Sequence, residues 1–462
     1  MMRTNEVVGI MTRYFPLALL VVIVFGMIFL VGYVFIYRNM VGGKRSFSKR
    51  RILVGTMLIG YVVMVIGVTF LNRGPNFSGI DLSLFSSYRE AWHRFSVRHW
   101  QFVYLNILMF APLGILLPLL HTRFKKAIWT IGAAAVATLS IETTQLLTGY
   151  GNFVVDDLFN NLLGATIGFG MTMGFITIKA KKLKKSMLYF APLIIVLLLS
   201  GGMVTYYQLK EFGNLSMRPS HKLDLAETVI SLDVQLDPHK NAVPIYRTEG
   251  YTKEAALKFV YDFFEKENLD TANMEIIAYQ NSGIYWTADR SHSISIEYLD
   301  ASYSYTDYSS FEEDLNSKDI DEATLIEKVR GFGIDVPQDS FFEKRETGQY
   351  QWTVDKEVIG NQLVDGYLSV QYYSDDTVKG IDNQLVRYDK VRNVQMKSEQ
   401  EAYQEILDGK FRFYMDDEKI ETIRVHKVGI SYQLDSKGFY QPIYLFYGAI
   451  NGREGTIPIP GI

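Results

Sequence analysis

The residues that could do chemistry gather in one stretch, Ser140 to Gly170, which is otherwise apolar. Glu142 and Gln145 are three residues apart, and Asp157 and Asn161 are four apart. Both spacings place two side chains on one face of a helix. Because ionisable groups inside a membrane are costly, they are often functional. The alternative hypothesis is structural, in which polar side chains near helix ends tie helices together.

The acids at positions 156 and 157 would open the second helix of this stretch. Carboxylates suit a helix N-terminus, where they interact with the dipole and can accept hydrogen bonds from free amides. For Asp156, a capping role and a role in a site remain equally good interpretations. Helix 158–178 also has Gly164 and Gly168, with Gly170 and Gly174 behind them. Small residues at this spacing predict close helix packing.

These residues need transmembrane helices to position them. An apolar run of about 20 residues spans a bilayer as a helix. Six such runs occur, and the first is too long for a typical signal peptide and has no small-residue cleavage site. The predicted spans are Pro16–Tyr37, Ile52–Leu71, Phe102–Leu120, Ala127–Leu147, Leu158–Ile178 and Met187–Tyr206.

Charge is distributed unevenly along the chain. Residues 1–205 contain twenty Lys and Arg against six acids, and residues 206–462 contain 27 against 44. Fourteen of those twenty basic residues lie in three loops, at 38–51, 121–126 and 179–185. Six alternating helices put these loops on one side, which is the cytoplasmic side because cytoplasmic loops carry excess Lys and Arg. The N-terminus and the acidic C-terminal half are then expected outside the cytoplasm, with six membrane crossings before the acidic half.

This topology places the polar groups at a common depth. Glu142 and Gln145 fall in the last two turns of an outward-running helix, and Asp157 and Asn161 begin the next helix at the same surface. The candidate outer-leaflet site therefore consists of Arg73, Asn106, Glu142, Gln145, Asp157 and Asn161.

The external segment 72–100 adds arginines and aromatics. Tyr88, Trp92 and Phe95 have helical spacing, which predicts a helix at the membrane interface. Arg offers a planar fork that suits phosphate. The candidates for binding a lipid headgroup or pyrophosphate are Arg89, Arg94 and Arg98. Arginines of an aromatic belt that touch ordinary phospholipid are the alternative.

The order of these motifs resembles the VanZ-like family of bacterial membrane proteins. The resemblance rests on "NILMFAPLG" (106–114), "IETTQ" (141–145) and "DDLFNNLLGATIG" (156–168), and covers about residues 52–178. It implies an envelope protein associated with resistance to teicoplanin, a glycopeptide with a lipid tail, and implies no established enzymatic reaction. The family often has an Arg and a further acid where this chain has Gly151 and Val154. An ion pair expected in relatives is therefore missing.

The C-terminal half predicts a soluble α+β domain. Amphipathic helices are expected at about 252–268, 322–332 and 398–410, the last opening with a Ser398–Glu401 capping box. Alternating strand-like runs follow, at 292–299, 366–373, 420–434 and 439–450. Repetition of a helix followed by strands weakly resembles PepSY and YycI-type extracytoplasmic units. The histidines lack metal-ligand spacing, so no metal site and no cofactor is predicted, and the acidic surface argues against a nucleic-acid partner.

The predicted architecture is a polytopic α-helical membrane protein of six helices followed by a soluble extracytoplasmic α+β domain. Its parts are a first helix with a basic loop (1–51), a VanZ-like transmembrane domain (52–178), a basic loop with the last helix (179–206) and the acidic domain (207–462).

Three functions are compatible with this architecture. The first is reduced lipoglycopeptide sensitivity, with a membrane lipid, the lipid tail of the drug or a lipid-linked wall precursor as partner. The second is an envelope sensor or scaffold whose outer domain binds a protein. The third is an intramembrane enzyme with Glu142 and Asp157 as acid and base, which lacks a supporting histidine or metal set.

Overall fold

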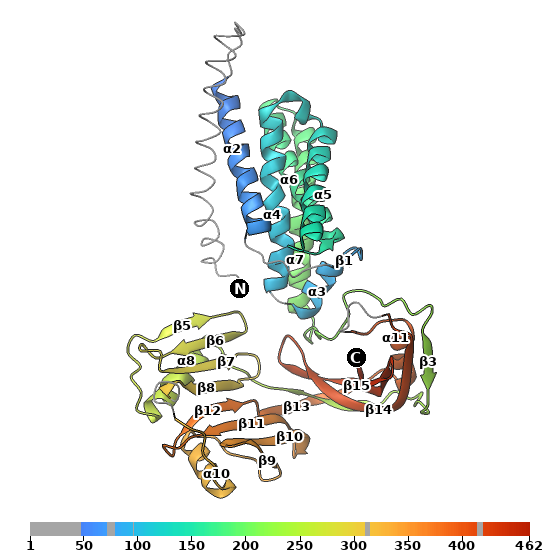
Figure 1. The fold of residues 1–462 in the computed structure, drawn as a ribbon. Coiled ribbons are helices and arrows are strands. Elements are labelled where there is room, and N and C mark those ends of the chain that lie inside the picture. The colour runs from blue at the N-terminus through green and yellow to red at the C-terminus, as the bar shows by residue number, and fades with distance from the viewer. Residues whose placement is uncertain (1–47, 72–78, 96, 310–314, 414–418) are drawn as a thin grey trace. The chain divides into compact units, whose positions relative to one another are not determined.

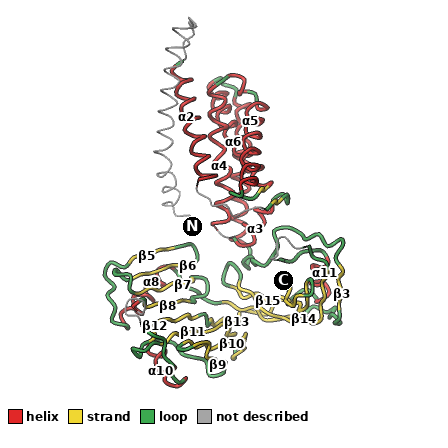
Figure 2. The backbone as a smooth tube through the Cα atoms, in the orientation of Figure 1, coloured by secondary structure: helices red, strands yellow, loops and turns green. Residues whose placement is uncertain are grey.

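The computed structural model describes residues 48–71, 79–95, 97–309, 315–413 and 419–462. The chain divides into two compact units between Glu211 and Phe212. The first unit is a helical bundle, and the second is built on a large sheet (Figures 1 and 2).

Five helices of the first unit are long and apolar enough to cross a membrane. They confirm five of the six predicted spans, and the sixth, Pro16–Tyr37, lies outside the described residues. The five are α2 (Lys49–Ile66) with its π-helical extension η2 (Gly67–Leu71), α4 (Val97–Leu120), α5 (Ala127–Thr148), α6 (Val155–Lys179) and α7 (Leu183–Leu209). Shorter elements connect them, namely β1 (Ile80–Asp81), α3 (Ser86–Arg94), η3 (Thr122–Lys125) and β2 (Phe153–Val154).

Helix α6 is the centre of the bundle, since it packs against α4, α5 and α7. Glycines allow this. A Cβ atom at Gly164 or Gly168 would lie 1.9 or 2.0 Å from a carbonyl oxygen of α4, and one at Gly170 would lie 2.1 Å from a carbonyl oxygen of α7. At Gly174 it would meet the Phe190 ring of α7. The predicted packing role of these glycines is confirmed, with one pair facing each neighbour.

Alternation of the helices gives the bundle two chemically different ends. We call "polar end" the end at which α2 and α5 finish and α4 and α6 begin. The opposite end has the basic connections at 121–126 and 179–185 and the start of α2 at Lys49. Between the ends, α7 exposes apolar side chains such as Leu188, Leu198 and Leu199, as expected of a surface that faces lipid.

The second unit has one sheet of fourteen strands, with the order β3-β14-β15-β4-β13-β11-β12-β8-β7-β6-β5 and with β16 on β15, β10 on β11 and β9 on β10. Neighbouring strands are antiparallel, except that β14 pairs parallel with β3. The strands are β3 (Val229–Leu232), β4 (Ala242–Arg247), β5 (Glu275–Ala278), β6 (Ser282–Trp286), β7 (His292–Glu297), β8 (Tyr303–Asp307), β9 (Phe341–Glu346), β10 (Gln349–Ile359), β11 (Gln362–Tyr372), β12 (Val378–Asn383), β13 (Val386–Gln395), β14 (Thr422–Leu434), β15 (Phe439–Ile450) and β16 (Arg453–Pro460).

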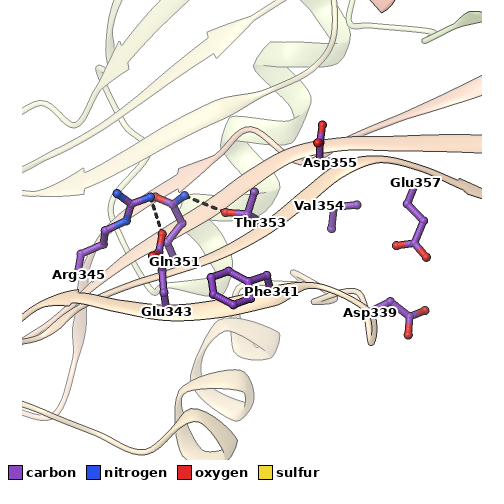
Figure 3. Close-up of a pocket in the computed structure, with 9 residues that line it drawn as sticks. All are labelled: Asp339, Phe341, Glu343, Arg345, Gln351, Thr353, Val354, Asp355 and Glu357. Carbon is purple, nitrogen blue, oxygen red and sulfur yellow. Dashed lines mark hydrogen bonds and ion pairs between the residues drawn. The ribbon is translucent and has the colours of Figure 1, made fainter. Parts of the chain in front are cut away.

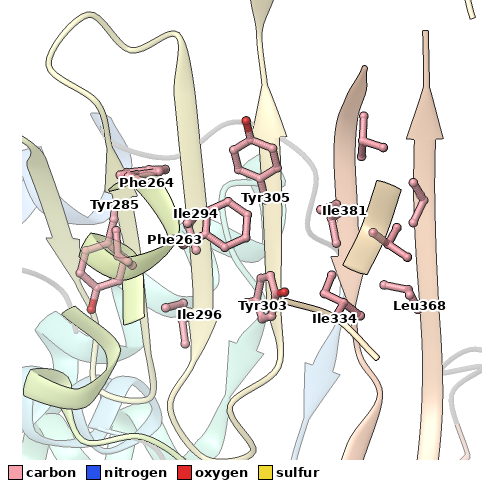
Figure 4. Close-up of a cluster of buried hydrophobic side chains, with 14 of the residues drawn as sticks. Phe263, Phe264, Tyr285, Ile294, Ile296, Tyr303, Tyr305, Ile334, Leu368 and Ile381 are labelled. Carbon is pink, nitrogen blue, oxygen red and sulfur yellow. The ribbon is translucent and has the colours of Figure 1, made fainter. Parts of the chain in front are cut away.

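Helices cover this sheet at two places. Helices α8 (Lys253–Lys266) and α10 (Glu322–Gly331) bury one core. In it, Phe263 and Phe264 lie over Tyr285, Ile294 and Tyr305 (Figure 4). Helix α11 (Glu399–Leu407) buries a second core against β14, β15 and β16. All three helices lie where the sequence predicts them.

Local signals in the sequence explain several ends of these elements. The predicted capping box is present, because Ser398 and Glu401 each accept a hydrogen bond from the backbone amide of the other. The β15–β16 hairpin turns at Asn451 and Gly452, whose φ angles are 51° and 76°. Two successive positive φ angles are typical of the tight turn that an Asn-Gly pair favours. The α+β class of this unit is therefore confirmed.

Candidate functional site

Two loops meet at the polar end of the bundle. Strand β1 pairs parallel with β2, which places Asp81 beside Val154. The Gly79 amide donates to the Asn152 side chain at 2.9 Å, and the Phe153 amide donates to the Gly79 carbonyl at 2.9 Å. This bridge joins segments about seventy residues apart in sequence and fixes where α6 begins.

Asp156 is a structural cap, but of α3 and not of its own helix. Its side chain is fully buried and accepts hydrogen bonds from the Phe85 amide at 2.5 Å and the Ser87 amide at 2.8 Å. Helix α3 has no capping side chain of its own, and Phe85 at its N-cap has a φ of 64°. Asp156 therefore satisfies the free amides that open α3.

Asp157 points to a different neighbour. Its Oδ1 accepts a hydrogen bond from the Asn106 amide, which joins α6 to α4. The structure thus brings together two of the predicted site residues, from helices separated by fifty positions in the chain.

Asn161 contacts α5. Its Nδ2 donates to Thr138 Oγ1 at 2.8 Å, and both residues are buried. Helices α5 and α6 are antiparallel, so one turn toward the polar end leads from Thr138 to Glu142 and from Asn161 to Asp157. Glu142 is 3% exposed. We call "polar cluster" the set of Asn106, Thr138, Glu142, Asp157 and Asn161.

Gln145 lies beside the polar cluster and contacts α2. Its Nε2 donates to the Thr69 carbonyl at 3.1 Å, and both residues are buried. Thr69 lies near the end of η2, where backbone carbonyls have no partner within the helix and can accept from a neighbouring side chain. Arg73, the remaining predicted site residue, lies outside the described residues.

The three predicted phosphate-binding arginines are exposed at the polar end. Arg89 donates to the Leu84 carbonyl at 3.1 Å, and Arg94 forms an ion pair with Glu90 one turn earlier in α3. Arg98 lies in the first turn of α4. The predicted helix around Tyr88 and Trp92 is confirmed as α3, while binding of phosphate by these arginines stays a prediction.

The polar cluster combines two carboxylates, two amides and one hydroxyl on three helices. Such a group can bind a polar ligand or exchange a proton with it. Thr138 was missing from the predicted set. The sequence could have indicated Thr138, because it lies four residues before Glu142 and therefore on the same helix face. Asn160, also missing, points about 100° away from Asn161 around α6, toward Tyr88 of α3.

The second unit has open hollows, but no predicted site residue lines them. One has a volume of about 570 Å³ over β9 and β10 (Figure 3). Glu343 pairs with Arg345 at 2.5 Å, and Gln351 donates to Thr353 at 2.9 Å. Its other polar residues are acids, namely Asp339, Asp355 and Glu357. Among the residues that the structure describes, no group of His, Asp and Glu is placed to hold a metal ion.

Residues 57–178, which contain the whole polar cluster, match the VanZ/LLP1 family. This segment is VanZ-like. The match spans the second half of α2, all of α4 and α5, and all of α6 but its last residue. Gly151 and Val154, where the family often has an Arg and an acid, lie before α6 in the VanZ-like segment, Val154 in β2.

Two solved structures are similar to parts of the chain. An uncharacterized protein from Eubacterium rectale has 11% identity over 53% of this chain and 90% of its own, with a TM-score of 0.26. The YpeB C-terminal domain of Bacillus megaterium has 10% identity over 46% of this chain and 93% of its own, with a TM-score of 0.19. No curated protein matches the chain.

Proposed function

We propose that this protein is a bacterial envelope membrane protein that lowers sensitivity to lipoglycopeptides such as teicoplanin. The VanZ-like segment supports the envelope role. The polar cluster supports a binding site within that segment, because five polar side chains of three helices gather where α5 ends and α6 begins. Polar groups inside a membrane lower the stability of the protein, so a function is the usual reason for their presence.

The charge of the connections supports an orientation in which the polar end is the outer one. Basic connections occupy the opposite end, and an excess of Lys and Arg is typical of cytoplasmic loops. With this orientation, α7 ends on the outer side and the acidic second unit follows it there. A cluster in the outer leaflet can meet a drug that inserts a lipid tail, or a wall precursor carried on a lipid.

The test is the minimum inhibitory concentration of teicoplanin and of vancomycin, which lacks a lipid tail. Strains would express the wild type, Glu142→Ala or Asp157→Asn. We expect the wild type to protect, and both variants to return to the empty-vector value. Protection against teicoplanin alone implicates the lipid tail, whereas protection against both drugs implicates the shared wall precursor.

Ser140→Ala is the matched control. Ser140 lies two residues before Glu142, but it is exposed, and its hydroxyl donates to the Val136 carbonyl of its own helix at 2.7 Å. The Ser140→Ala variant should protect like the wild type. Equal membrane levels of all variants must be shown by immunoblotting. If Glu142→Ala and Asp157→Asn protected fully at those levels, the polar cluster would not be the site.

A further inference from the structure

A second buried polar group lies on the side of α6 that faces α3. Asn160 is fully buried, and its Oδ1 accepts a hydrogen bond from the Tyr88 hydroxyl. This bond uses one end of the amide. The other end, Nδ2, has no hydrogen-bond partner among the described residues.

Trp100 of α4 presents another unused donor at the same place. Its Nε1 is buried and also has no acceptor in the part of the chain that the structure describes. The Trp100 ring meets the Tyr88 ring edge-on, with centroids 6.4 Å apart. Both unused donors therefore adjoin one tyrosine. A buried donor without an acceptor is costly, so two together indicate that a ligand supplies the acceptors.

The surroundings favour an uncharged acceptor attached to an apolar group. Phe85 and Phe159 pack edge-on against Tyr88, with centroids 5.7 and 6.4 Å away. The Asp156 carboxylate lies close by, held by the start of α3, and its charge disfavours an anion such as phosphate. Burial, with a smaller contribution from Asp156, raises the pKa of Tyr88 to about 12, so its hydroxyl stays protonated.

The position along the helices matches the depth at which lipid carbonyls occur. Trp100 lies in the first turn of α4 and Asn160 in the second turn of α6, both at the polar end. Trp and Tyr side chains concentrate at the boundary between headgroups and acyl chains, where one end of the ring is wet and the other apolar. In ordinary diacyl lipids the ester carbonyls lie at this boundary.

We propose that Asn160 Nδ2 and Trp100 Nε1 bind the ester carbonyl oxygens of a diacyl membrane lipid, whose chains run along the apolar flank of α4 and α7. This site goes beyond the proposed resistance function, because it uses neither carboxylate of the polar cluster. Asn160 contacts Tyr88 of α3, whereas Asp157 and Asn161 contact α4 and α5. The Tyr104 hydroxyl of α4 donates to Ser200 of α7 at 2.8 Å, which holds the two helices together beside the site.

The test compares lipids that differ only in the carbonyl. The full-length protein in detergent micelles would be titrated with diester phosphatidylglycerol and with its diether analogue, which has the same headgroup and chain length but no carbonyl. The readout is the thermal unfolding midpoint. We expect the diester lipid to raise the midpoint of the wild type by several degrees more than the diether lipid does.

Two variants remove the donors singly. Trp100→Phe keeps an aromatic ring without the N–H, and Asn160→Leu keeps the approximate volume without the amide. Each variant should show a smaller difference between the unfolding midpoints in diester and in diether lipid. If Asn160→Leu does not fold, the result for Trp100→Phe is sufficient to test the proposal. Trp129→Phe is the control, because Trp129 lies at the opposite end of the bundle under Arg123. It should keep the full difference.

Three results would overturn the proposal. One is an equal effect of both lipids on the wild type, which would indicate that the headgroup phosphate or the chains alone are bound. Another is retention of the difference in Trp100→Phe. The third is a failure of diacylglycerol, which has both ester carbonyls and no phosphate, to stabilise the wild type. None of these measurements involves an antibiotic, so they leave the resistance proposal to its own test.

Discussion

Adjacent residues of α6 have different roles because successive side chains on a helix point about 100° apart. Asp156 and Asn160, four positions apart, face α3 through the Phe85 amide and the Tyr88 hydroxyl. Asp157 and Asn161 form the next pair and face α4 and α5. The Asp-Asp and Asn-Asn dipeptides thus form two i,i+4 pairs. The acid of the first pair caps α3, and the second pair belongs to the polar cluster.

The sequence predicted only part of this site. The position of Asp157 and Asn161 in the first two turns of an apolar helix followed from hydropathy, and their depth in the membrane stays a prediction. The role of Asp156 could not follow, because its partners are amides of a loop about seventy residues earlier in the chain. Nothing local to α6 distinguishes an aspartate that caps its own helix from one that caps another.

The Thr138–Asn161 hydrogen bond can be tested by an almost isosteric change. Thr138→Val removes the acceptor of Asn161 Nδ2 and leaves a buried amide unsatisfied. We expect the free energy of unfolding in detergent to fall by roughly 1–3 kcal/mol. Denaturation titrations monitored by circular dichroism would measure it.

Thr166→Val is the matched control for that experiment. Thr166 also lies on α6, but its hydroxyl donates a hydrogen bond to the Leu162 carbonyl of the same helix at 2.8 Å. Its loss leaves no orphaned partner on another helix, so we expect a change below about 0.5 kcal/mol. Equal losses in both variants would show that the Thr138 contact contributes nothing specific.

His292 in β7 predicts a pH dependence for the second unit. Burial lowers the pKa of His292 below its usual 6.5, although the nearby Asp307 and Asp289 oppose this shift. The unfolded chain therefore takes up a proton below about pH 6.5 before the folded protein does. The free energy of unfolding should fall as the pH drops through this value.

His292→Gln removes the titration and should flatten stability between pH 7 and pH 5.5. Urea denaturation at several pH values would show this. His221, which is exposed, provides the control, and His221→Gln should follow the wild-type curve. An unchanged slope in His292→Gln would assign the acid sensitivity to other groups.

At the scale of elements, α4 and α6 form a parallel pair that packs backbone to backbone. A Cβ atom at Gly164 would lie 1.9 Å from the Ile107 carbonyl oxygen. Gly164→Ala must therefore push the helices apart, and we expect a loss of about 1–3 kcal/mol in the free energy of unfolding. Thermal denaturation in detergent would measure the effect.

Gly201→Ala in α7 is the contrasting substitution, since a Cβ atom there has nothing within 4 Å. Alanine has a higher helix propensity than glycine, so this variant should be as stable as the wild type or up to about 1 kcal/mol more stable. Destabilisation by Gly201→Ala equal to that by Gly164→Ala would mean that close α4–α6 contact is not the cause.

Element types were largely predictable and element partners were not. Hydropathy located the five described membrane helices, and alternation located β7, β11, β14 and β15. The β1–β2 bridge escaped prediction because each strand has only two residues, too few for a periodic pattern. The sheet order escaped it too, since β11 pairs with β10, β12 and β13, and alternation specifies a face without specifying a neighbour.

For the whole molecule, the change from basic to acidic composition falls close to the division between the two units. The first residues of the second unit, 212–217, contribute to the stability of that unit. The Gly213 amide donates to Asp435 at 2.6 Å, and the Asn214 amide donates to Ser436 Oγ at 2.8 Å. Leu215 and Met217 are buried against Ile443.

A fragment of residues 212–462 should therefore fold alone, and a fragment of residues 219–462 should be less stable. Loss of two buried apolar side chains and of the hydrogen bonds to Asp435 and Ser436 should cost roughly 3–5 kcal/mol in the free energy of unfolding. Urea denaturation of both fragments would test this. Equal stability would place the true start of the folded unit after residue 218.

The α4–α6 pair also has a consequence for how such sequences can evolve. Its contacts keep a fixed register: Ile107 meets Gly164, Ala111 meets Gly168, and Ile115 meets Thr172. A single-residue insertion between the first and last of these in one helix would rotate everything beyond it by about 100° and turn the glycines away from their partners. Insertions and deletions in relatives should therefore be absent from residues 107–115 and 164–172, and should collect in the connections at 121–126 and 180–182. The length of the chain can therefore vary among relatives in the connections between the helices, but not within the packed segments of α4 and α6.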